Sequence, residues 1–282
     1  MTARTFPPGF VWGTATAAHQ VEGNNFNCDL WALEQARPSI FREPSGDAVD
    51  QWHRFADDVA VLAALGLKAY RFSIEWARIE PNEGEFSASV LDHYQRCIHA
   101  CLERGVEPVL TFHHFTAPLW VAQRGGMTSG AFPDLFARYC ETATRALSGF
   151  ATACTINELN VPLLIRDMVS AGIKGPNGTA LREAAEAALG GPIESTFLFT
   201  PGADLLTNGI AAHRKARDAI KSVRPEVQVG VTLSIQDEQA EPGAEAVRDA
   251  RLDEIVNPFL DAVSCDDFIG VQTYTRMVAK SD

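Results

Sequence analysis

The sequence predicts an α/β fold of the (β/α)8 TIM-barrel type, with only about six βα units in its 282 residues. Short apolar runs rich in strand-forming residues alternate with longer segments of helical period, which indicates a parallel sheet covered by helices. Polar residues follow the ends of several of these runs, where the active face of a barrel would lie. We expect the six strands to span residues 10–12, 69–74, 107–112, 153–156, 228–233 and 268–271.

Helix signals fill the segments between the expected strands. Between the first two strands, apolar residues recur at helical spacing, at Trp52, Phe55, Val59 and Leu62. Ser87 is the expected N-cap of a second helix, which ends at Gly105. Two further helices are expected over residues 132–150 and 211–223. No linker or low-complexity tract divides the chain, so we expect residues 1–282 to form a single, incomplete barrel domain.

An open, doubly wound sheet is the alternative to a barrel. That architecture calls for a glycine-rich turn after an early strand, and residues 13–17 (GTATA) lack the G-x-G-x-x-G pattern. No P-loop pattern is present either. A barrel predicts polar residues just past the strand ends, and the sequence supplies them at 75, 113–114, 157–158, 236–238 and 272–274. The barrel is therefore favoured.

The acidic composition limits the partners that we expect. A formal net charge of −12 leaves no basic surface to neutralise phosphates, which argues against nucleic acid. The first residues, MTARTFPPGFVWG, contain no apolar signal segment, and no run approaches the length of a membrane span. The six cysteines are scattered, and we expect buried, reduced thiols. These features predict a cytoplasmic protein.

The spacing of histidines and cysteines shows no metal-binding pattern. Cys97 and Cys101 lie one helical turn apart without a second pair of ligands, and His113 and His114 are adjacent. Neighbouring residues of a strand face opposite sides, so one histidine is expected to face the barrel lumen and the other the helices. We therefore expect no metal ion and no cofactor.

Glu158 is the first candidate for a chemical role. Its carboxyl group directly follows an apolar strand, where partial desolvation raises the pKa, and a proton donor at neutral pH needs such a pKa. The alternative is a structural acid that pairs with an arginine or caps the next helix. Alternation places Asn157 and Glu158 on opposite faces, so both line a pocket only if the strand curls at its end.

Arg71 lies inside an apolar strand, and a buried guanidinium needs a carboxylate partner. Glu75 or Glu22 would serve structurally, whereas a catalytic carboxylate would serve functionally. Polar side chains able to bond sugar hydroxyls also occur near the strand ends, at Gln20, Asn157, Gln272 and Tyr274. Three tryptophans also lie near strand ends, at Trp12, Trp76 and Trp120. Each could stack on a pyranose ring, but packing in the core is the simpler role.

Five motifs occur in order along the chain. They are FVWGTATAAHQVEG (10–23), YRFSIEWARI (70–79), TFHHFTAPLW (111–120), TINE (155–158) and FIGVQTYT (268–275). Together they resemble the signatures of glycoside hydrolase family 1, the β-glucosidase family, from its N-terminal segment through its acid/base motif to its sixth strand. The likeness covers essentially the whole chain, and five ordered motifs are highly specific in combination.

The resemblance implies a retaining β-glycosidase, which hydrolyses O-glycosidic bonds of β-glycosides on a (β/α)8 barrel. It implies Glu158 as the acid/base and Asn157 as the neighbour that binds the sugar 2-hydroxyl. It also implies that Gln20 and His114 bind the sugar. Arg71 and Tyr274 are implied as partners of the nucleophile. Two positions depart from the family: Leu159 replaces a proline, and Gln272 replaces the usual strand-six asparagine.

The family's nucleophile, in a Thr-Glu-Asn-Gly-like motif on strand seven, has no counterpart in this sequence. Retaining hydrolysis needs two carboxyl groups. The leading hypothesis is therefore a β-glycosidase completed by a missing C-terminal segment or by a second chain. The alternative is a catalytically incomplete fragment or pseudoenzyme that binds sugars without cleaving them.

Overall fold

The computed structural model describes residues 5–166 and 177–280. Its main sheet consists of six parallel strands in consecutive order: β1 (Gly13–Ala15), β2 (Ala69–Ser73), β3 (Glu107–His113), β4 (Thr152–Ile156), β5 (Gln228–Ser234) and β7 (Phe268–Gln272). A doubly wound sheet reverses its strand order at a switch point, whereas consecutive parallel strands build the wall of a barrel. β1 and β7 are the two edges of this sheet and are not paired with each other in the described part of the chain.

The first strand begins three residues later than predicted. Residues 10–12 precede β1, and their side chains are exposed. Phe10 and Trp12 instead pack with Phe6 in a small aromatic cluster, at centroid distances of 4.4 to 4.9 Å. The pairing starts at Gly13 because β1 lies very close to β2 there, where a Cβ atom would come within 2.7 Å of the Ala69 carbonyl oxygen. The apolar run therefore marks the approach to the strand.

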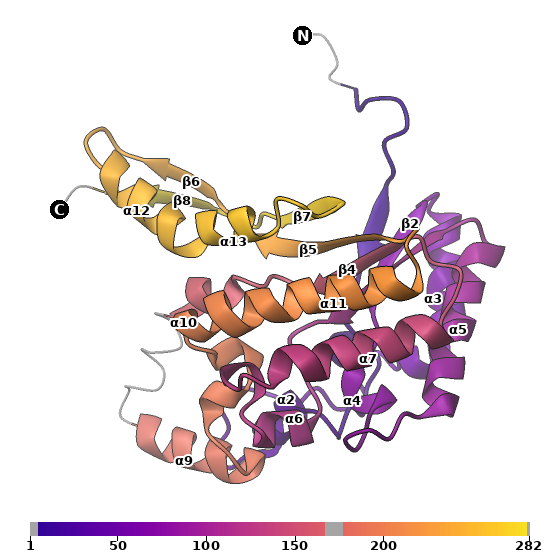
Figure 1. The fold of residues 1–282 in the computed structure, drawn as a ribbon, viewed down its shortest axis with the longest axis horizontal. Coiled ribbons are helices and arrows are strands. Elements are labelled where there is room, and N and C mark those ends of the chain that lie inside the picture. The colour runs from indigo at the N-terminus through magenta and orange to yellow at the C-terminus, as the bar shows by residue number, and fades with distance from the viewer. Residues whose placement is uncertain (1–4, 167–176, 281–282) are drawn as a thin grey trace.

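Four long helices pack on the sheet: α3 (Gln51–Ala64), α5 (Ala88–Glu103), α7 (Phe132–Ala146) and α11 (Ile210–Val223). Ser87 caps α5 as expected, because its hydroxyl accepts the Val90 backbone N–H at 3.4 Å. Gly66 and Gly105 follow α3 and α5 with φ of +79° and +65°, a conformation that favours glycine. α7 and α11 lie side by side in front of the sheet in Figure 1.

Shorter elements connect the strands and long helices. The α-helices among them are α1 (Ala18–Val21), α2 (Asp29–Gln35), α4 (Trp76–Ile79), α6 (Leu119–Gln123), α9 (Gly178–Leu189), α10 (Gly202–Asp204), α12 (Glu245–Ile255) and α13 (Asn257–Ala262). Single turns of other helix types are η1 (Gly126–Thr128), η2 (Ile193–Ser195), η3 (Phe197–Phe199) and the π-helical η4 (Leu205–Gly209). In the described ranges, no helix is long and apolar enough to cross a bilayer.

A second, two-stranded parallel sheet was not predicted. It pairs β6 (Asp237–Ala240) with β8 (Arg276–Ala279) and continues beyond β5 and β7 at the left of Figure 1. Asp237 and Glu238, expected as polar groups at the end of strand five, belong to this sheet. Asp237 pairs with Arg276 at 2.6 Å, and Glu238 pairs with Arg251 at 3.1 Å. Both carboxylates are therefore held in ion pairs, Asp237 at the surface and Glu238 with its side chain almost fully buried.

Aromatic packing dominates the core between β2, β3 and α7. The buried Trp76 ring stacks on Tyr139 at 5.0 Å, and its Nε1 donates to Glu80 at 2.8 Å. Trp120 donates its Nε1 to the Glu80 carbonyl at 3.0 Å. Trp76 is thus a core residue. Five of the cysteines are buried free thiols, but Cys265 is exposed, which corrects the expectation for that position.

Candidate active site

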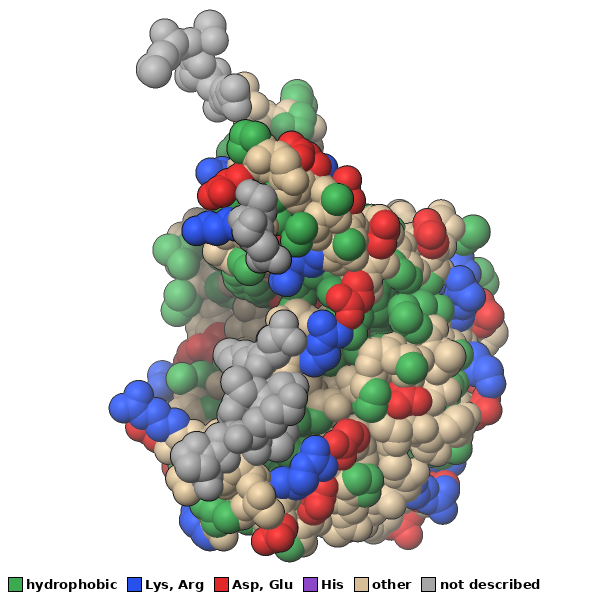
Figure 2. Space-filling view, turned by 90° about the vertical axis from the view of Figure 1, so that its left-hand side faces the viewer, with side chains coloured by type: hydrophobic (Ala, Val, Ile, Leu, Met, Phe, Trp, Pro, Cys, Tyr) green, Lys and Arg blue, Asp and Glu red, His purple; other side chains and the backbone are tan. Residues whose placement is uncertain are grey.

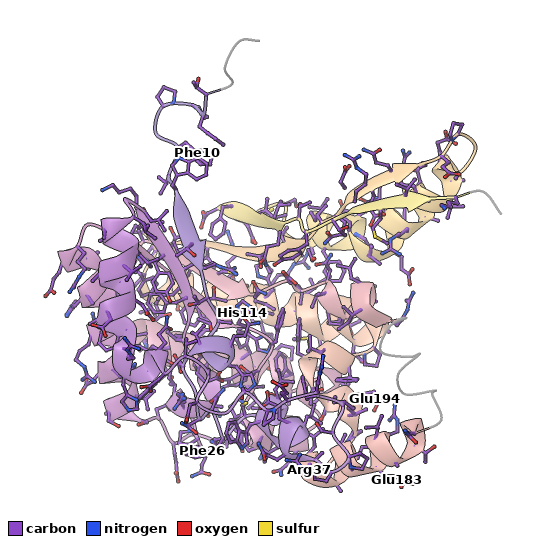
Figure 3. The ribbon with its side chains drawn as sticks, turned by 180° about the vertical axis from the view of Figure 1, so that it is seen from behind. Phe10, Phe26, Arg37, His114, Glu183 and Glu194 are labelled. Atoms are coloured by element: carbon purple, nitrogen blue, oxygen red, sulfur yellow. The ribbon has the colours of Figure 1, made fainter. Side chains whose placement is uncertain are left out.

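A cavity of about 300 Å³ opens among the carboxyl ends of β1, β2, β3, β4 and β7. It is lined by Ala15, Thr16, Gln20, Arg71, His114, Phe115, Glu158, Gln272 and Tyr274. The structure therefore brings together all of the site residues predicted from the sequence except Asn157. Figure 3 shows His114 near the centre of the molecule, whereas Phe10 lies beyond the start of β1.

Glu158 adopts an unusual backbone conformation directly after β4. Its φ of +50° is left-handed, and its backbone N–H donates to the Thr232 hydroxyl at 2.8 Å. The sequence left open whether the strand curls at its end. The left-handed residue provides that curl, because it ends the alternation of side chains between the two faces of β4. The carboxyl group lines the cavity and accepts the Tyr274 hydroxyl at 2.8 Å.

The surroundings of Glu158 favour its protonated form. Burial raises the pKa of its carboxyl group, while the hydrogen bond from Tyr274 and the charge of Arg71 oppose that rise. Because burial prevails, the pKa lies above the ordinary value for glutamate. A raised pKa is the direction of shift that a carboxylic proton donor requires.

Asn157 is buried next to the cavity rather than lining it. Its Oδ1 accepts three hydrogen bonds, from Arg71 Nη2 at 2.6 Å, Gln272 Nε2 at 2.8 Å and Thr232 Oγ1 at 3.1 Å. Gln20 and His114 line the cavity, whereas Asn157 contacts two of its lining residues, Arg71 and Gln272, from behind. Three donors hold its side chain in the layer just beneath the lining residues.

The two adjacent histidines face opposite sides of β3. His114 reaches the cavity, whereas His113 is enclosed by the rings of Phe132, Phe136 and Phe197. Burial lowers the pKa of each imidazole to about 3, and the positive charge of Arg71 contributes at His114. Both rings are therefore neutral at physiological pH, and His114 can offer a neutral hydrogen-bonding group to a ligand.

Arg71 has no carboxylate within ion-pairing distance in the described part of the chain. Its guanidinium donates to Asn157 and, at 3.9 Å, contacts the Cys154 sulfur. The two structural partners considered from the sequence are engaged elsewhere. Glu22 pairs with Arg78 at 3.0 Å, and Glu75 accepts hydrogen bonds from Asn25, Thr116 and the Ala77 backbone. A positive charge therefore lines the cavity without its counter-ion.

Tyr274 contacts the predicted acid/base in this structure. Its hydroxyl lies 2.8 Å from Glu158 Oε1 and 2.9 Å from Gln272 Oε1. The side chain as a whole is exposed, but local loss of hydration at the hydroxyl and the adjacent Glu158 raise the pKa of the phenol to about 12, so it remains a donor. Gln20, on α1, is exposed and makes no side-chain hydrogen bond to the rest of the described chain. Its amide is available to a ligand.

Among the described residues, Glu158 is the one carboxylate that lines the cavity. Glu75, Asp237 and Glu238, the other acids near strand ends, are bonded elsewhere. No group of three or more His, Cys, Asp or Glu side chains in these ranges is placed to hold a metal ion. The described site thus contains one carboxyl group of raised pKa, one guanidinium without a carboxylate partner among the described residues, and several neutral polar groups.

Sequence reasoning missed Thr16 and Phe115, which line the cavity, and Thr232, which lies behind it. Thr232 carried a weak signal, since it is a polar residue inside the apolar run VGVTL. Its partners are far away along the chain. Local periodicity could not show what it bonds.

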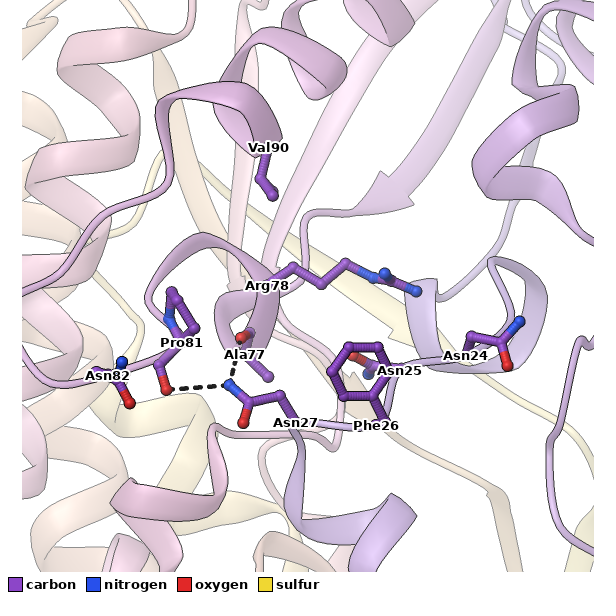
Figure 4. Close-up of a pocket in the computed structure, with 9 residues that line it drawn as sticks. All are labelled: Asn24, Asn25, Phe26, Asn27, Ala77, Arg78, Pro81, Asn82 and Val90. Carbon is purple, nitrogen blue, oxygen red and sulfur yellow. Dashed lines mark hydrogen bonds between the residues drawn. The ribbon is translucent and has the colours of Figure 1, made fainter.

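A larger cavity, of about 380 Å³, lies elsewhere in the molecule (Figure 4). It is lined by Asn24, Asn25, Phe26, Asn27, Ala77, Arg78, Pro81, Asn82 and Val90. Arg78, its charged residue, is held by the ion pair with Glu22 and lies over the Trp52 ring at 4.3 Å. None of the nine lining residues can donate or accept a proton at neutral pH, so size alone does not mark the site.

Acidic and basic side chains are interspersed over the face seen in Figure 2, without a continuous basic patch. This face is the side toward which β5 and β7 run in Figure 1. On this face, therefore, no basic surface is available to phosphates, in line with the net charge of −12.

Comparison with known proteins gives one family. The family model for glycosyl hydrolase family 1 matches residues 2–278. Beta-glucosidase A of Acetivibrio thermocellus is 30% identical over 244 residues, which cover 83% of this chain and 50% of that protein. Beta-glucosidase A of Thermotoga maritima is 36% identical over 146 residues, or 49% of this chain and 33% of that protein. The chain thus spans about half or less of these relatives.

Solved structures agree with this result. The crystal structure of beta-glycosidase BGL167 is 45% identical and superposes with a TM-score of 0.90, covering 97% of this chain and 67% of that one. The apo structure of a beta-glucosidase, 1317, is 39% identical with a TM-score of 0.89, covering 97% and 68%. These likenesses and the consecutive strand order confirm the predicted barrel type. The family match over nearly all residues shows that the chain belongs to glycosyl hydrolase family 1.

Proposed function

We propose that this chain forms most of the active site of a retaining β-glycosidase of the β-glucosidase type, with Glu158 as the acid/base. The observation that carries the proposal is a carboxyl group of raised pKa in the same cavity as the unpaired guanidinium of Arg71. A partly buried cation without a counter-ion is unfavourable, so the geometry supports a second carboxylate beside Arg71. That carboxylate would be the nucleophile.

Two carboxyl groups about 5 Å apart are what retaining hydrolysis requires. In the first step, Glu158 would donate its proton to the glycosidic oxygen while the nucleophile attacks the anomeric carbon and the bond to the aglycone breaks. In the second step, the Glu158 carboxylate would take a proton from water, whose oxygen attacks the anomeric carbon and releases the nucleophile. The raised pKa of Glu158 suits the first step.

The remaining polar groups would bind the sugar. Gln20 and His114 offer neutral hydrogen-bonding groups in the cavity, and Asn157 would offer its amide N–H to the 2-hydroxyl. The Tyr274 hydroxyl would donate a hydrogen bond to whichever of the two carboxylates, Glu158 or the nucleophile, is ionised. It contacts Glu158 in this structure, and the family resemblance implies contact with the nucleophile. The substrates would be small β-glycosides or oligosaccharides, with no cofactor.

We further propose that the nucleophile is contributed by polypeptide outside these 282 residues, either a continuation of the barrel or a second chain. Residues 1–282 would then be one incomplete barrel domain. The five buried free thiols favour a reducing compartment, which supports a cytoplasmic location.

A second function is favoured by a specific observation, the absence of a second carboxylate among the described cavity-lining residues. In that case the chain would bind sugars without cleaving them. Release of p-nitrophenol from p-nitrophenyl β-glucoside separates the two functions, with binding of glucose measured in parallel by calorimetry. Hydrolysis that Glu158→Gln abolishes supports the glycosidase, whereas binding without hydrolysis in the natural gene product supports the second function. Neither activity nor binding would contradict both.

A further inference from the structure

Thr232 lies on β5, one strand away from Asn157 and Glu158, and its side chain is almost fully buried. Its hydroxyl makes three contacts with the site. The oxygen accepts the Glu158 backbone N–H at 2.8 Å and Gln272 Nε2 at 3.1 Å, and it lies 3.1 Å from Asn157 Oδ1. A hydroxyl has two lone pairs and one proton. Since both lone pairs are occupied by N–H donors, its proton is directed to Asn157 Oδ1.

The contact with Glu158 concerns the backbone of the predicted acid/base. A left-handed φ is unfavourable for a residue with a side chain, and a buried N–H without an acceptor is costly. The Thr232 hydroxyl supplies that acceptor, and the Thr232 carbonyl also accepts the Leu159 N–H at 3.2 Å. The turn that directs Glu158 into the cavity is therefore held by one residue of the neighbouring strand.

The contact with Asn157 determines how its amide is oriented. With Arg71, Gln272 and Thr232 all donating to Oδ1, the oxygen must face these three groups. Nδ2 then faces the other way, and no acceptor for it is present in residues 5–166 and 177–280. The side chain is thus fixed as a donor rather than an acceptor toward a ligand.

The orientation of Thr232 is itself enforced by the next strand. A Cβ atom on Gly270 of β7 would come within 2.5 Å of Thr232 Cγ2. The absence of a side chain at Gly270 therefore leaves room for the threonine methyl group. A β-branched side chain has few rotamers, so with its methyl over Gly270 its hydroxyl is directed at the turn.

We propose that Thr232 is a positioning residue, whose hydroxyl holds the Asn157 amide and the Glu158 turn in one fixed relation. Its effect on catalysis rests on the proposed function. Asn157 would bind the hydroxyl next to the reacting carbon, and Glu158 would protonate the leaving oxygen. The one hydroxyl of Thr232 therefore orients both groups: the Asn157 amide that would recognise the 2-hydroxyl, and the Glu158 turn that positions the acid/base.

The test compares Thr232→Val with Thr232→Ser in the natural gene product. Valine keeps the shape and removes the hydroxyl, whereas serine keeps the hydroxyl. Thr144→Val is the matched control, since it removes a buried hydroxyl that bonds only within α7, to the Cys140 carbonyl at 2.6 Å. For each protein, kcat/KM is measured on an aryl β-glucoside and on its 2-deoxy analogue.

We expect Thr232→Val to reduce the preference for the glucoside over the 2-deoxy analogue by about tenfold, because the lost contact acts through the 2-hydroxyl. Thr232→Ser and Thr144→Val should keep the wild-type preference. Equal losses on both substrates in Thr232→Val would overturn the inference, since they would show a structural role alone.

A second measurement does not depend on hydrolysis. Exchange of the Glu158 backbone N–H with deuterium is followed by NMR in the same variants. Faster exchange in Thr232→Val than in Thr232→Ser supports the positioning role, and unchanged exchange overturns it. If the wild-type protein hydrolyses neither substrate, the proposed function fails by itself, and amide exchange still decides the role of Thr232.

Discussion

At the scale of single residues, the chemistry of the site depends on which form of Glu158 its surroundings favour. Burial raises the pKa of this carboxyl group against the opposing effects of Tyr274 and Arg71. A raised pKa and a position in an open cavity suit a proton donor. They suit a structural acid less well, because a structural acid would be ion-paired. Two predictions follow from this balance.

Glu158→Gln should nearly abolish hydrolysis of β-glycosides with poor leaving groups, because these need protonation of the glycosidic oxygen. Substrates with good leaving groups should still form the glycosyl-enzyme, and azide should restore its breakdown. Steady-state rates on an alkyl and a dinitrophenyl β-glucoside, with and without azide, measure both effects. Equal loss on both substrates without rescue, at unchanged stability, would show that Glu158 is not the acid/base.

Tyr274→Phe should raise the pKa of Glu158 further, because the hydroxyl favours the ionised carboxylate. A proton donor is active while it is protonated, and activity declines as pH rises through its pKa. The alkaline limb of kcat/KM against pH should therefore move to higher pH in this variant. Tyr139→Phe, which removes a buried hydroxyl bonded to Ile74 and Phe112 carbonyls, should leave the limb in place. A limb that moves to lower pH contradicts the prediction.

At the scale of elements, the position of β7 against β5 depends on the close approach of their backbones. A Cβ atom at Gly230 would come within 2.2 Å of the Phe268 carbonyl oxygen, in a pairing where Gly230 is opposite Phe268. Because β7 carries Gln272 and leads to Tyr274, any displacement of β7 also displaces one wall of the cavity.

Gly230→Ala should therefore lower the free energy of unfolding by about 1 to 3 kcal/mol, the usual cost of overpacking. Gly130→Ala is the control, since a Cβ atom there meets nothing within 4 Å. Urea denaturation of both variants provides the comparison. Similar midpoints for the two variants would mean that β7 shifts without cost and that its contact with β5 is loose.

At the scale of the whole molecule, six parallel strands leave two open edges. The side chains before β1 and on β7 are apolar and exposed, among them Phe10, Trp12, Ile269 and Val271. Unpaired edges of this kind are templates for association, and the tilt and stagger of barrel strands prevent a remnant from simply contracting. The two unpaired edges, and an Arg71 guanidinium that has no carboxylate partner among the described residues, both agree with the proposal that further polypeptide completes the barrel.

Residues 1–282 expressed alone should therefore not form a stable, active monomer. We expect association in sedimentation, a broad melting transition and no β-glucosidase activity. The natural gene product, or the chain mixed with a partner that completes about two more βα units, should be monodisperse and melt cooperatively. A monodisperse, cooperatively melting and active monomer of residues 1–282 would contradict this prediction.

Reading the sequence alone was enough to predict the alternation of strands and helices, the barrel type and five residues that line the cavity, out of six predicted for the site. The alternation depends on local periodicity and turn residues, and the barrel type on polar groups at the carboxyl ends of the strands. The site residues, including the choice of His114 over His113, came from the match to the family's motifs. Each can be read from neighbours in the chain. Even the family motifs are short, local patterns of this kind.

The remaining features arise from contacts that form only when the chain folds. The left-handed turn at Glu158, the burial of Asn157 and the role of Thr232 depend on hydrogen bonds between residues 74 or more positions apart. The start of β1 depends on contact with Ala69, and the small β6–β8 sheet on pairing across some 40 residues. Such contacts leave no periodic trace in the sequence, because each needs one donor and one acceptor that folding brings together.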